Sequence, residues 1–327
     1  MNNPTILLTG GAGYIGSHTA FLLAQQGYRV VIVDRLMHQQ TFNPPWATAI
    51  INADFADNEV LNHIFTTYKI TAVMHFAAFI DVGESVSNPQ VYYDNNVIKT
   101  LALLQAMRSH NVSNFIFSSS CAVYGIPQVL PLAEDHPKNP ISPYGKTKLM
   151  AEMILQDFNT AYGINFVALR YFNAAGALPE EKLGEVHIPE THLIPLLIQA
   201  ALYKKPFTIF GTDHPTKDGT CVRDFLHVLD IAQAHVLALN HLQQQRPSDF
   251  FNLGTGHGFS VHEMLKATET LLGLPIKTVY AKARAGDPPL LIADPTRAHT
   301  ILNWHPTHSR LDNIIKTAAA FSKLMSC

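Results

Sequence analysis

The sequence "LLTGGAGYIGSHTAFLLAQQGYRVVIVD" (residues 7–34) contains the pattern that decides the fold. An apolar run leads into a glycine-rich loop, a helical pattern follows, and a second apolar run ends at Asp34. Two overlapping glycine patterns, G-x-G-x-x-G and the wider G-x-x-G-x-x-G, are formed by Gly10, Gly11, Gly13 and Gly16. Such glycines permit a tight turn and let a pyrophosphate approach backbone N–H groups at the positive end of the next helix. The stretch predicts a strand–loop–helix–strand unit that binds a dinucleotide.

The acidic residue at the end of the second run predicts which dinucleotide is bound. Asp34 follows Gly13 by twenty-one residues, where a carboxylate accepts hydrogen bonds from the adenosine ribose. Because this carboxylate would repel a 2′-phosphate, we predict NAD rather than NADP, although the neighbouring Arg35 favours the opposite choice. Asp54, at the end of the third predicted strand, is a second candidate for the adenine end, or else a simple cap. A glycine turn without any ligand is the alternative for the loop.

Short β-branched or aromatic runs alternate with helical spacing through the first half of the chain. The predicted strands are residues 5–10, 29–34, 49–54, 72–77, 114–120 and 165–172. The predicted helices are residues 14–26, 57–68, 91–110 and 143–161. Near-continuous apolar strands joined by helices indicate an α/β fold with a doubly wound parallel sheet that is covered on both faces.

The pattern loosens after residue 173 into Gly- and Pro-rich stretches such as residues 210–220. A further strand (250–255) and an amphipathic helix (260–272) follow. We therefore predict two domains. An NAD-binding Rossmann domain spans residues 1–172, with a return segment near 224–255, and a smaller mixed α/β substrate domain spans 173–327.

Composition excludes several classes of protein. The 327 residues are 47% hydrophobic and 15% charged with a formal net charge of −2, so no basic field recruits nucleic acid or an anionic membrane. The three cysteines are far apart and form no C-x-x-C pattern, which argues against a disulfide framework or a zinc site. No signal peptide or membrane span is evident, and we expect a cytoplasmic protein.

The seventeen histidines form no H-E-x-x-H, and "HPTH" (305–308) contains a proline, so no metal is predicted.

A second stretch, "SPYGKTKLMAE" (residues 142–152), predicts a helix that begins with a chemically useful pair. Ser142 is a good N-cap and Pro143 suits the first helical position. On such a helix Tyr144 and Lys148 lie on one face, about 5–6 Å apart at their Cβ atoms. The pair places an ammonium beside a phenol.

This pair suits a general base for nicotinamide chemistry. A phenol with a pKa of about 10 needs roughly 4 kcal/mol of help to ionise near pH 7, and Lys148 and a nicotinamide cation both favour the phenolate. Ser120 ends a predicted strand of the parallel sheet, where its hydroxyl could bridge a substrate oxygen and the phenol. A solvated Tyr–Lys pair and a strand-end serine are the simpler alternatives. Their joint occurrence with the glycine loop favours a catalytic trio of Ser120, Tyr144 and Lys148.

Taken together, these residues resemble the extended short-chain dehydrogenase/reductase family, and in particular its nucleotide-sugar 4-epimerase branch. The similarity covers nearly the whole chain through "TGGAGYIGSHT", "HFAAF", "VGESV", "YYDNNV", "FSSSCAVYG", "SPYGKTKLMAE", "RYFNAAGA", "DGTCVRDFLHV", "FNLGTG" and "GDPP". The "DGTCVRDFLHV" segment is far more specific than the glycine loop.

The resemblance implies further site residues. Those implied to line the NAD site, besides the glycines and the catalytic pair, are Tyr14, Ile15, Asp34, Asp54, Phe55, Phe76, Ala77, Ala78, Asn95 and Phe172. Those implied to hold a UDP-sugar, besides Ser120 and Tyr144, are Asn173, His192, Leu193, Phe210, Arg223, Arg284, Asp287 and Leu291. Two arginines from separate segments also suit a diphosphate on chemical grounds, since a guanidinium can bind it bidentately; surface solvation is their alternative.

The implied reaction is reversible 4-epimerisation of a UDP-hexose, from UDP-galactose to UDP-glucose. It proceeds through transient oxidation to a 4-keto sugar with tightly bound NAD, so no net redox change results. Alternatives are a 4-epimerase for UDP-N-acetylhexosamines or UDP-pentoses, a nucleotide-sugar dehydratase or reductase, and a non-catalytic NAD-binding regulator. A dehydratase needs carboxylates just after the serine, where this chain has Cys121 and Ala122.

Three departures from the family pattern bear on specificity. Ile80 stands where some members carry a cofactor-contacting lysine, and His192 replaces an asparagine near the uracil–ribose end. Leu291 takes the place of a bulky tyrosine that restricts some members to plain hexoses, which leaves the sugar open. In the family, helices equivalent to 91–110 and 143–161 form a homodimer bundle; the same apolar stripes could instead pack on the sheet.

Overall fold

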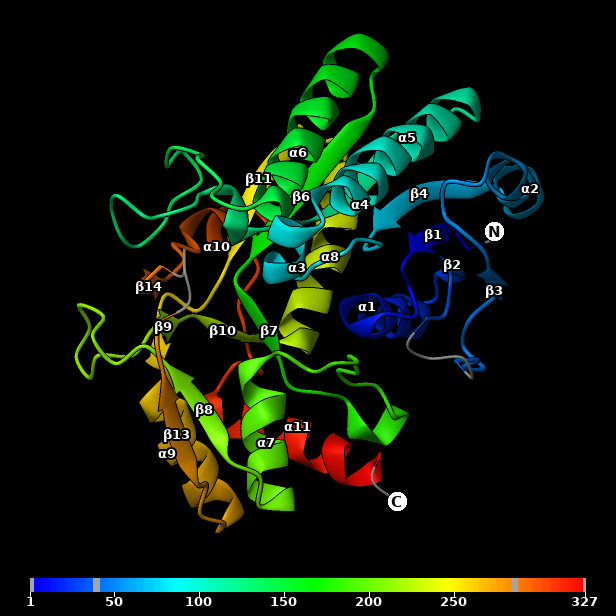
Figure 1. Cartoon of the computed structure of the whole chain (residues 1–327). Coiled ribbons are helices and arrows are strands. Elements are labelled where there is room, and N and C mark those ends of the chain that lie inside the picture. The colour runs from blue at the N-terminus through cyan, green and yellow to red at the C-terminus, as the bar shows by residue number, and fades with distance from the viewer. Residues whose placement is uncertain (1–2, 38–41, 284–287, 326–327) are drawn as a thin grey trace.

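The computed structural model describes residues 3–37, 42–283 and 288–325. A seven-stranded sheet forms its centre, with every strand parallel to its neighbours (Figure 1). Its strands, in spatial order, are β11 (Asp249–Leu253), β6 (Asn165–Tyr171), β5 (Asn114–Ser120), β4 (Ile70–His75), β1 (Thr5–Thr9), β2 (Arg29–Asp34) and β3 (Ala49–Asn52). The order reverses direction at β1, so the carboxyl ends of β1 and β4 flank a crevice of the kind that binds ligands in open α/β sheets.

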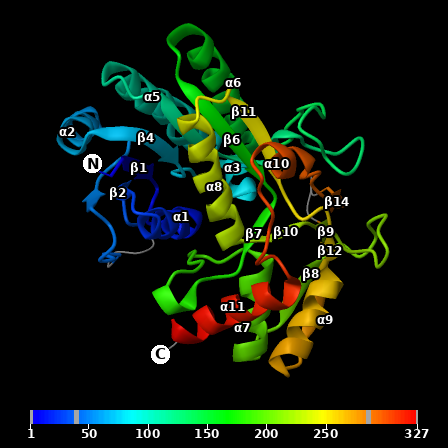
Figure 2. The same cartoon turned by 180° about the vertical axis from the view of Figure 1, so that it is seen from behind.

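Helices cover both faces of this sheet. On one face α1 (Tyr14–Gln25) and α8 (Val228–Gln243) pack on it, and Figure 2 shows α8 in front of the sheet with α1 beside it. On the other face lie α2 (Asn58–Tyr68), α5 (Lys99–Ser109) and α6 (Pro143–Tyr162). The predicted doubly wound α/β fold is confirmed.

The predicted helix over residues 91–110 is divided in the structure. It consists of α4 (Pro89–Tyr93), the π-helical turn η1 (Asp94–Ile98) and α5, and α3 (Val82–Ser87) precedes it. A π turn is rare and appears most often at functional sites. It turns Asn95 and Asn96 into the interior.

The second half of the chain forms three small sheets around a separate apolar core. They pair β10 (Phe225–His227) with β7 (Asn173–Ala175), the central β9 (Val222–Arg223) with β12 (Phe259–Ser260) on one side and β14 (Leu290–Leu291) on the other, and β13 (Thr278–Ala281) with β8 (Phe207–Phe210). Helices α7 (Leu193–Tyr203), α9 (Val261–Leu272) and α11 (Leu311–Leu324) enclose this core, and α10 (Thr296–Ile301) lies beside β11. We propose a Rossmann domain that includes α8 and β11 as its return segment, and a second domain built on this core.

This half is more helical than its loosened sequence pattern suggests. Helix α8 is buried on most of its surface, including Val228, Ile231, Ala234 and Val236, so only a narrow side that includes Gln233 and Gln243 is polar and the contrast between its faces is weak. Over the described ranges of the chain, no helix combines the length and apolar character needed to cross a bilayer.

Candidate functional site

The glycine loop connects β1 to α1 at the crevice of the sheet. Gly10 adopts a φ of +71°, and a Cβ placed there would lie 2.5 Å from the backbone nitrogen of Ala77. Gly13 is the N-cap of α1, and no side chain among the described residues caps this helix end. The first-turn N–H groups of this twelve-residue helix are therefore available to an anionic group. Because the loop's glycines carry no side chains, a pyrophosphate could approach these N–H groups closely.

Gly16 holds the loop against the helix, and its replacement is expected to damage both. A Cβ at Gly16 would lie 2.3 Å from the carbonyl oxygen of Gly10 and 2.9 Å from the Cα of Gly11. Since backbone atoms cannot move aside cheaply, we expect Gly16→Ala to cost about 1–3 kcal/mol of unfolding free energy and to reduce bound dinucleotide. Urea denaturation and the absorbance of released dinucleotide measure the two effects.

Gly83→Ala is the matched control, because that helical glycine faces only the Asp81 carboxylate at 3.3 Å. An unchanged dinucleotide content together with wild-type stability in Gly16→Ala would show that the loop tolerates a larger residue.

Asp34 fixes the loop from the end of β2. Its carboxylate accepts hydrogen bonds from the N–H groups of Ala12 (3.0 Å) and Leu36 (2.9 Å). Each carboxylate oxygen has more than one acceptor position, so both remain able to accept a ribose hydroxyl. The predicted ribose-binding residue thus lies directly beside the glycine loop.

Asp54 lies near the same end of the sheet with two cations. Lys99 donates to Oδ2, the Ala56 N–H donates to Oδ1 at 3.0 Å, and the Arg35 guanidinium is 4.0 Å away. Burial, the largest single influence, raises the pKa of Asp54, but the hydrogen bonds and the charges of Lys99 and Arg35 together lower it. The carboxylate is therefore ionised, and an ion pair with Lys99 was not anticipated from the sequence.

The loop after β4 and the π turn form another wall of the crevice. The N–H groups of Phe76 and Ala77 both donate to the carbonyl of Thr9. The buried Asn96 accepts from the Phe79 N–H and donates to its carbonyl, and Asn95 donates to Asn96. The π turn therefore orients Asn95 through Asn96, a residue that sequence reasoning missed. Other predicted cofactor residues include Phe55 and Phe172, which are buried, Ala78 on the same loop, and Tyr14 and Ile15 on the first turn of α1.

The predicted helix start at Ser142 is confirmed. The Ser142 hydroxyl accepts from the Gly145 N–H at 3.1 Å, and Pro143 occupies the first turn. The ammonium of Lys148 lies 5.9 Å from the centre of the Tyr144 ring and donates to the carbonyl of Ser118 at 2.8 Å. The pair thus lies against the end of β5.

Ser120 is the last residue of β5 and joins the pair. Its hydroxyl accepts from the Ala122 N–H and lies close enough to the Tyr144 phenol to lower the pKa of that phenol. Burial raises the pKa of Tyr144 to about 12, against a lowering by Ser120, and burial lowers the pKa of Lys148 to about 7. Within the chain alone, burial therefore outweighs the priming by lysine that the sequence predicted.

A second phenol lies beside this trio. The hydroxyl of Tyr171 hydrogen-bonds to Ser118, and the proximity of Tyr144 adds to the burial that raises the pKa of Tyr171. Sequence reasoning did not select Tyr171, although it belongs to the quoted "RYFNAAGA" segment.

A buried ion pair supports the trio from behind. Glu152, one helical turn after Lys148, binds the guanidinium of Arg170 through two hydrogen bonds of 2.7 and 2.8 Å. It also accepts from the hydroxyl of Ser119, the neighbour of Ser120. This network links α6, β5 and β6, and the sequence analysis missed it.

Part of the predicted substrate set lies on the other side of the trio. Leu291 pairs with Arg223 across β14 and β9, and Leu291 packs in an apolar cluster with Cys121 and Phe172. Asp224, which was not selected, ties this region together by accepting hydrogen bonds from the backbone of Thr255, Gly256 and Ala293 and from the Thr255 hydroxyl. Arg223 and Leu291 are thereby fixed near Ser120.

The remaining predicted substrate residues are more scattered. Asn173 begins β7, Phe210 ends β8 and is 37% exposed, and His192 and Leu193 begin α7. The predicted Arg284 and Asp287 lie outside the described residues.

His192 belongs to a cluster that the sequence analysis did not identify. Its Nδ1 lies 2.8 Å from Glu185 and 3.0 Å from Glu190, and these two contacts raise its pKa to about 10 although burial lowers it. His187 lies 3.3 Å from Glu185. The spacing E-x-H-x-x-E-x-H over residues 185–192 is the sequence signal that could have revealed the cluster.

Comparisons with known proteins agree with this geometry. The model of the NAD dependent epimerase/dehydratase family matches residues 6–254. A UDP-glucose 4-epimerase of Lactobacillus helveticus is 47% identical over 321 residues, covering 97% of this chain and 97% of that protein. The UDP-glucose 4-epimerase of Brucella ovis in complex with NAD is 48% identical, covers 97% of both chains and superposes with a TM-score of 0.93. That of Stenotrophomonas maltophila, with bound NAD and formylated UDP-arabinopyranose, is 38% identical, covers 99% of both chains and has a TM-score of 0.93.

Proposed function

The chain belongs to the NAD dependent epimerase/dehydratase family, and we propose that it is an enzyme that interconverts UDP-galactose and UDP-glucose by inversion at C4. The observation that carries this proposal is the meeting of Tyr144, Lys148 and Ser120 at the carboxyl end of β5, in a chain nearly half identical to epimerases over its full length. The enzyme is an isomerase.

NAD fits the residues at the crevice. The glycine loop admits a pyrophosphate, Asp34 faces the loop, and Asn95 is held by the π turn. Bound NAD supplies an oxidant for C4 of the sugar and the means to reduce it again, so it stays with the enzyme through turnover.

The chain's own residues manage the proton and the sugar. Tyr144 removes the proton of the 4-hydroxyl, Ser120 bridges that oxygen and the phenol, and the same proton returns after the keto sugar has turned over. Because the pyranose must rotate, Arg223 and its neighbours hold mainly the nucleotide, and binding energy is concentrated away from the reacting ring.

The positive charge of oxidised NAD would help Tyr144 to ionise. Burial raises the pKa of Tyr144 to about 12, so ionisation near neutral pH needs positive charge from Lys148 and from the oxidised nicotinamide acting together. With NAD bound in its oxidised state, Tyr144 would therefore be the residue that serves as base.

Two alternatives to UDP-galactose epimerisation, namely other sugar substrates and dehydration, are supported to different degrees. N-acetylhexosamine or pentose substrates are favoured by Leu291, which is smaller than tyrosine, and by the relative crystallised with formylated UDP-arabinopyranose. Dehydration is disfavoured, because Cys121 occupies the position where that reaction needs an acid, and burial raises the pKa of its thiol to about 12.

A homodimer through α5 and α6 is part of the proposal. These helices lie side by side in Figure 1, and Met150 and Met153 of α6 are 40% and 56% exposed. Apolar side chains left open on a helix face suit a second copy of the same surface. A cytoplasmic location is proposed from the cysteine usage, and Cys121 is a free thiol.

An assay panel tests the function. One purified sample is incubated with UDP-glucose, UDP-galactose, UDP-GlcNAc and UDP-arabinose without added cofactor. We expect conversion of UDP-galactose to UDP-glucose with no change in nicotinamide absorbance at steady state. A requirement for stoichiometric NAD would indicate a dehydrogenase, and exclusive turnover of UDP-GlcNAc or UDP-arabinose would transfer the proposal to those sugars.

A further inference from the structure

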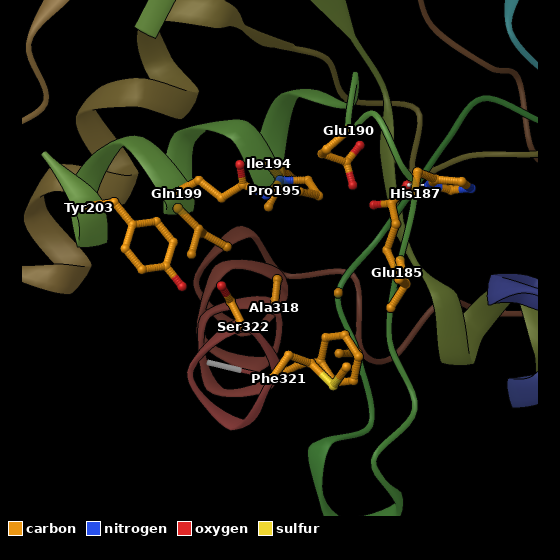
Figure 3. Close-up of a pocket in the computed structure, with 15 residues that line it drawn as sticks. Glu185, His187, Glu190, Ile194, Pro195, Gln199, Tyr203, Ala318, Phe321 and Ser322 are labelled. Carbon is orange, nitrogen blue, oxygen red and sulfur yellow. Dashed lines mark ion pairs between the residues drawn. The ribbon is translucent and has the colours of Figure 1, made fainter. Parts of the chain in front are cut away.

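A compact cluster of four metal-ligating side chains lies between β7 and α7. Glu185, His187, Glu190 and His192 each offer one ligand atom, and these four atoms lie within 4.8 Å of one another. Figure 3 shows three of them, Glu185, His187 and Glu190, gathered at one end of a cavity of about 240 Å³, opposite Tyr203. All four come from eight consecutive residues.

The two carboxylates of the cluster are more buried than its two imidazoles, an arrangement that suits the binding of a cation. The side chains of Glu185 and Glu190 are only 8% and 9% exposed, whereas those of His187 and His192 are 21% and 40% exposed. The carboxylates therefore lie deeper and the imidazoles face the way in. An ion could enter past the imidazoles without unfolding the segment.

The charge of the cluster is unbalanced without such an ion. Two carboxylates that are removed from water need compensation, and His192, the imidazole that contacts both of them, can supply only one positive charge. The effect reaches Tyr14 at the start of α1, where burial and then the charges of Glu185 and Glu190 raise the pKa of the phenol. A divalent cation between two neutral imidazoles would neutralise both carboxylates.

The donor set and its size favour a transition metal. Zinc binds nitrogen and carboxylate oxygen at about 2.0–2.2 Å in a tetrahedral arrangement, so two ligand atoms of one ion lie roughly 3.5 Å apart. The longest separation in the cluster, at most 4.8 Å, therefore closes when each of the two atoms shifts by under about 1 Å. Calcium and magnesium prefer sites of oxygen alone, whereas imidazole with carboxylate suits zinc and its neighbours.

We propose that Glu185, His187, Glu190 and His192 bind one divalent transition-metal cation, with Zn²⁺ as the representative ion. The site reverses the expectation from sequence that no metal is bound. It closes a loop of eight residues immediately before Leu193, the first residue of α7, and it lies beside Tyr14 of the glycine-loop helix. The cation would therefore fix the segment that joins the dinucleotide side of the crevice to the predicted UDP-binding side.

Metal binding is measured first and without any assay of turnover. The full-length protein is freed of metal with a chelator, and Zn²⁺ binding is followed by isothermal titration and by elemental analysis after gel filtration. We expect one Zn²⁺ per chain at this site. Glu185→Gln and His187→Ala should each weaken binding by at least about tenfold, since each removes a direct ligand.

His63→Ala, on the exposed surface of α2, is the matched control and should bind like the wild type. The melting temperature of each variant is compared in chelator, so that a lost site is distinguished from a lost fold. If His187→Ala does not fold, the nearly isosteric Glu185→Gln decides. Wild-type protein that binds no Zn²⁺, or variants that bind it as tightly as the wild type, would overturn the proposal.

The consequence for substrate rests on the proposed function, but the binding itself does not. If the loop holds the nucleotide side of the site, chelation should raise the KM for the UDP-sugar at least about threefold while kcat changes less. One Zn²⁺ per chain in a protein that lacks epimerase activity would support the metal site and refute the function. Epimerase activity in a protein that binds no Zn²⁺ would support the function and refute the metal site.

Discussion

Tyr144→Phe is expected to lower kcat by about 10²–10⁴-fold, which is the contribution of a positioned general base. The substitution removes one hydroxyl and keeps the ring that packs near Lys148 and Ser120. Substrate binding through the nucleotide and the NAD content should therefore persist, so the loss falls on kcat rather than on KM. Coupled assay of UDP-glucose formation measures the rate, and absorbance of the denatured protein measures the NAD.

Tyr171→Phe is the matched control, because it removes a neighbouring phenolic hydroxyl that hydrogen-bonds to Ser118. We expect that control to lose less than tenfold. The rate of the wild type should rise with pH toward the pKa of the phenol, since the deprotonated form is the base, and this rise should be absent in Tyr144→Phe. A rate near that of the wild type in Tyr144→Phe would remove Tyr144 from the role of base.

Local signals in the sequence predicted the elements that depend on local chemistry. The glycine loop and the N-cap at Ser142 each depend on residues within a few positions of one another, the acidic end of β2 follows the loop at a fixed spacing, and all three occur where they were expected. The π turn after α4 was not predictable in this way, because its register is set by Asn96 bridging to Phe79, seventeen residues earlier. Contacts of that kind leave no periodic pattern.

The sequence named Arg223 and Leu291 but not how they come together, and it did not select Asp224, for the same reason. Arg223 and Leu291 meet through pairing of two-residue strands that are far apart in the chain, and the Asp224 carboxylate holds two further backbone segments, at residues 255–256 and at Ala293. Neither strand is long enough to show an alternating pattern. Spacing alone indicated that Lys148 approaches Tyr144, but the burial that raises the pKa of the phenol in the chain alone has no local signal in the sequence.

The largest expected loss of stability comes from Glu152→Gln. Glu152 and Arg170 are each about 1% exposed, and their two parallel hydrogen bonds neutralise a charge pair inside the sheet–helix interface. The amide leaves the guanidinium buried without its counter-charge, which costs about 3–5 kcal/mol when one partner of a buried pair is removed. Because domains are stable by about 5–15 kcal/mol, such a loss consumes a large part of the total.

Urea denaturation measures this change, and Asp312→Asn provides the control. Asp312 pairs with the exposed Lys316 at 3.4 Å, and exposed pairs often contribute nothing measurable, so we expect the control to unfold at the wild-type urea concentration. Glu152→Gln should unfold at a much lower concentration with an unchanged slope. A variant as stable as the control would mean that Arg170 keeps enough compensation from the Tyr124 hydroxyl and the Glu134 carbonyl, its other two partners. In that case the positive charge of Arg170 would be compensated by all of its hydrogen-bond partners together, and not by the Glu152 carboxylate alone.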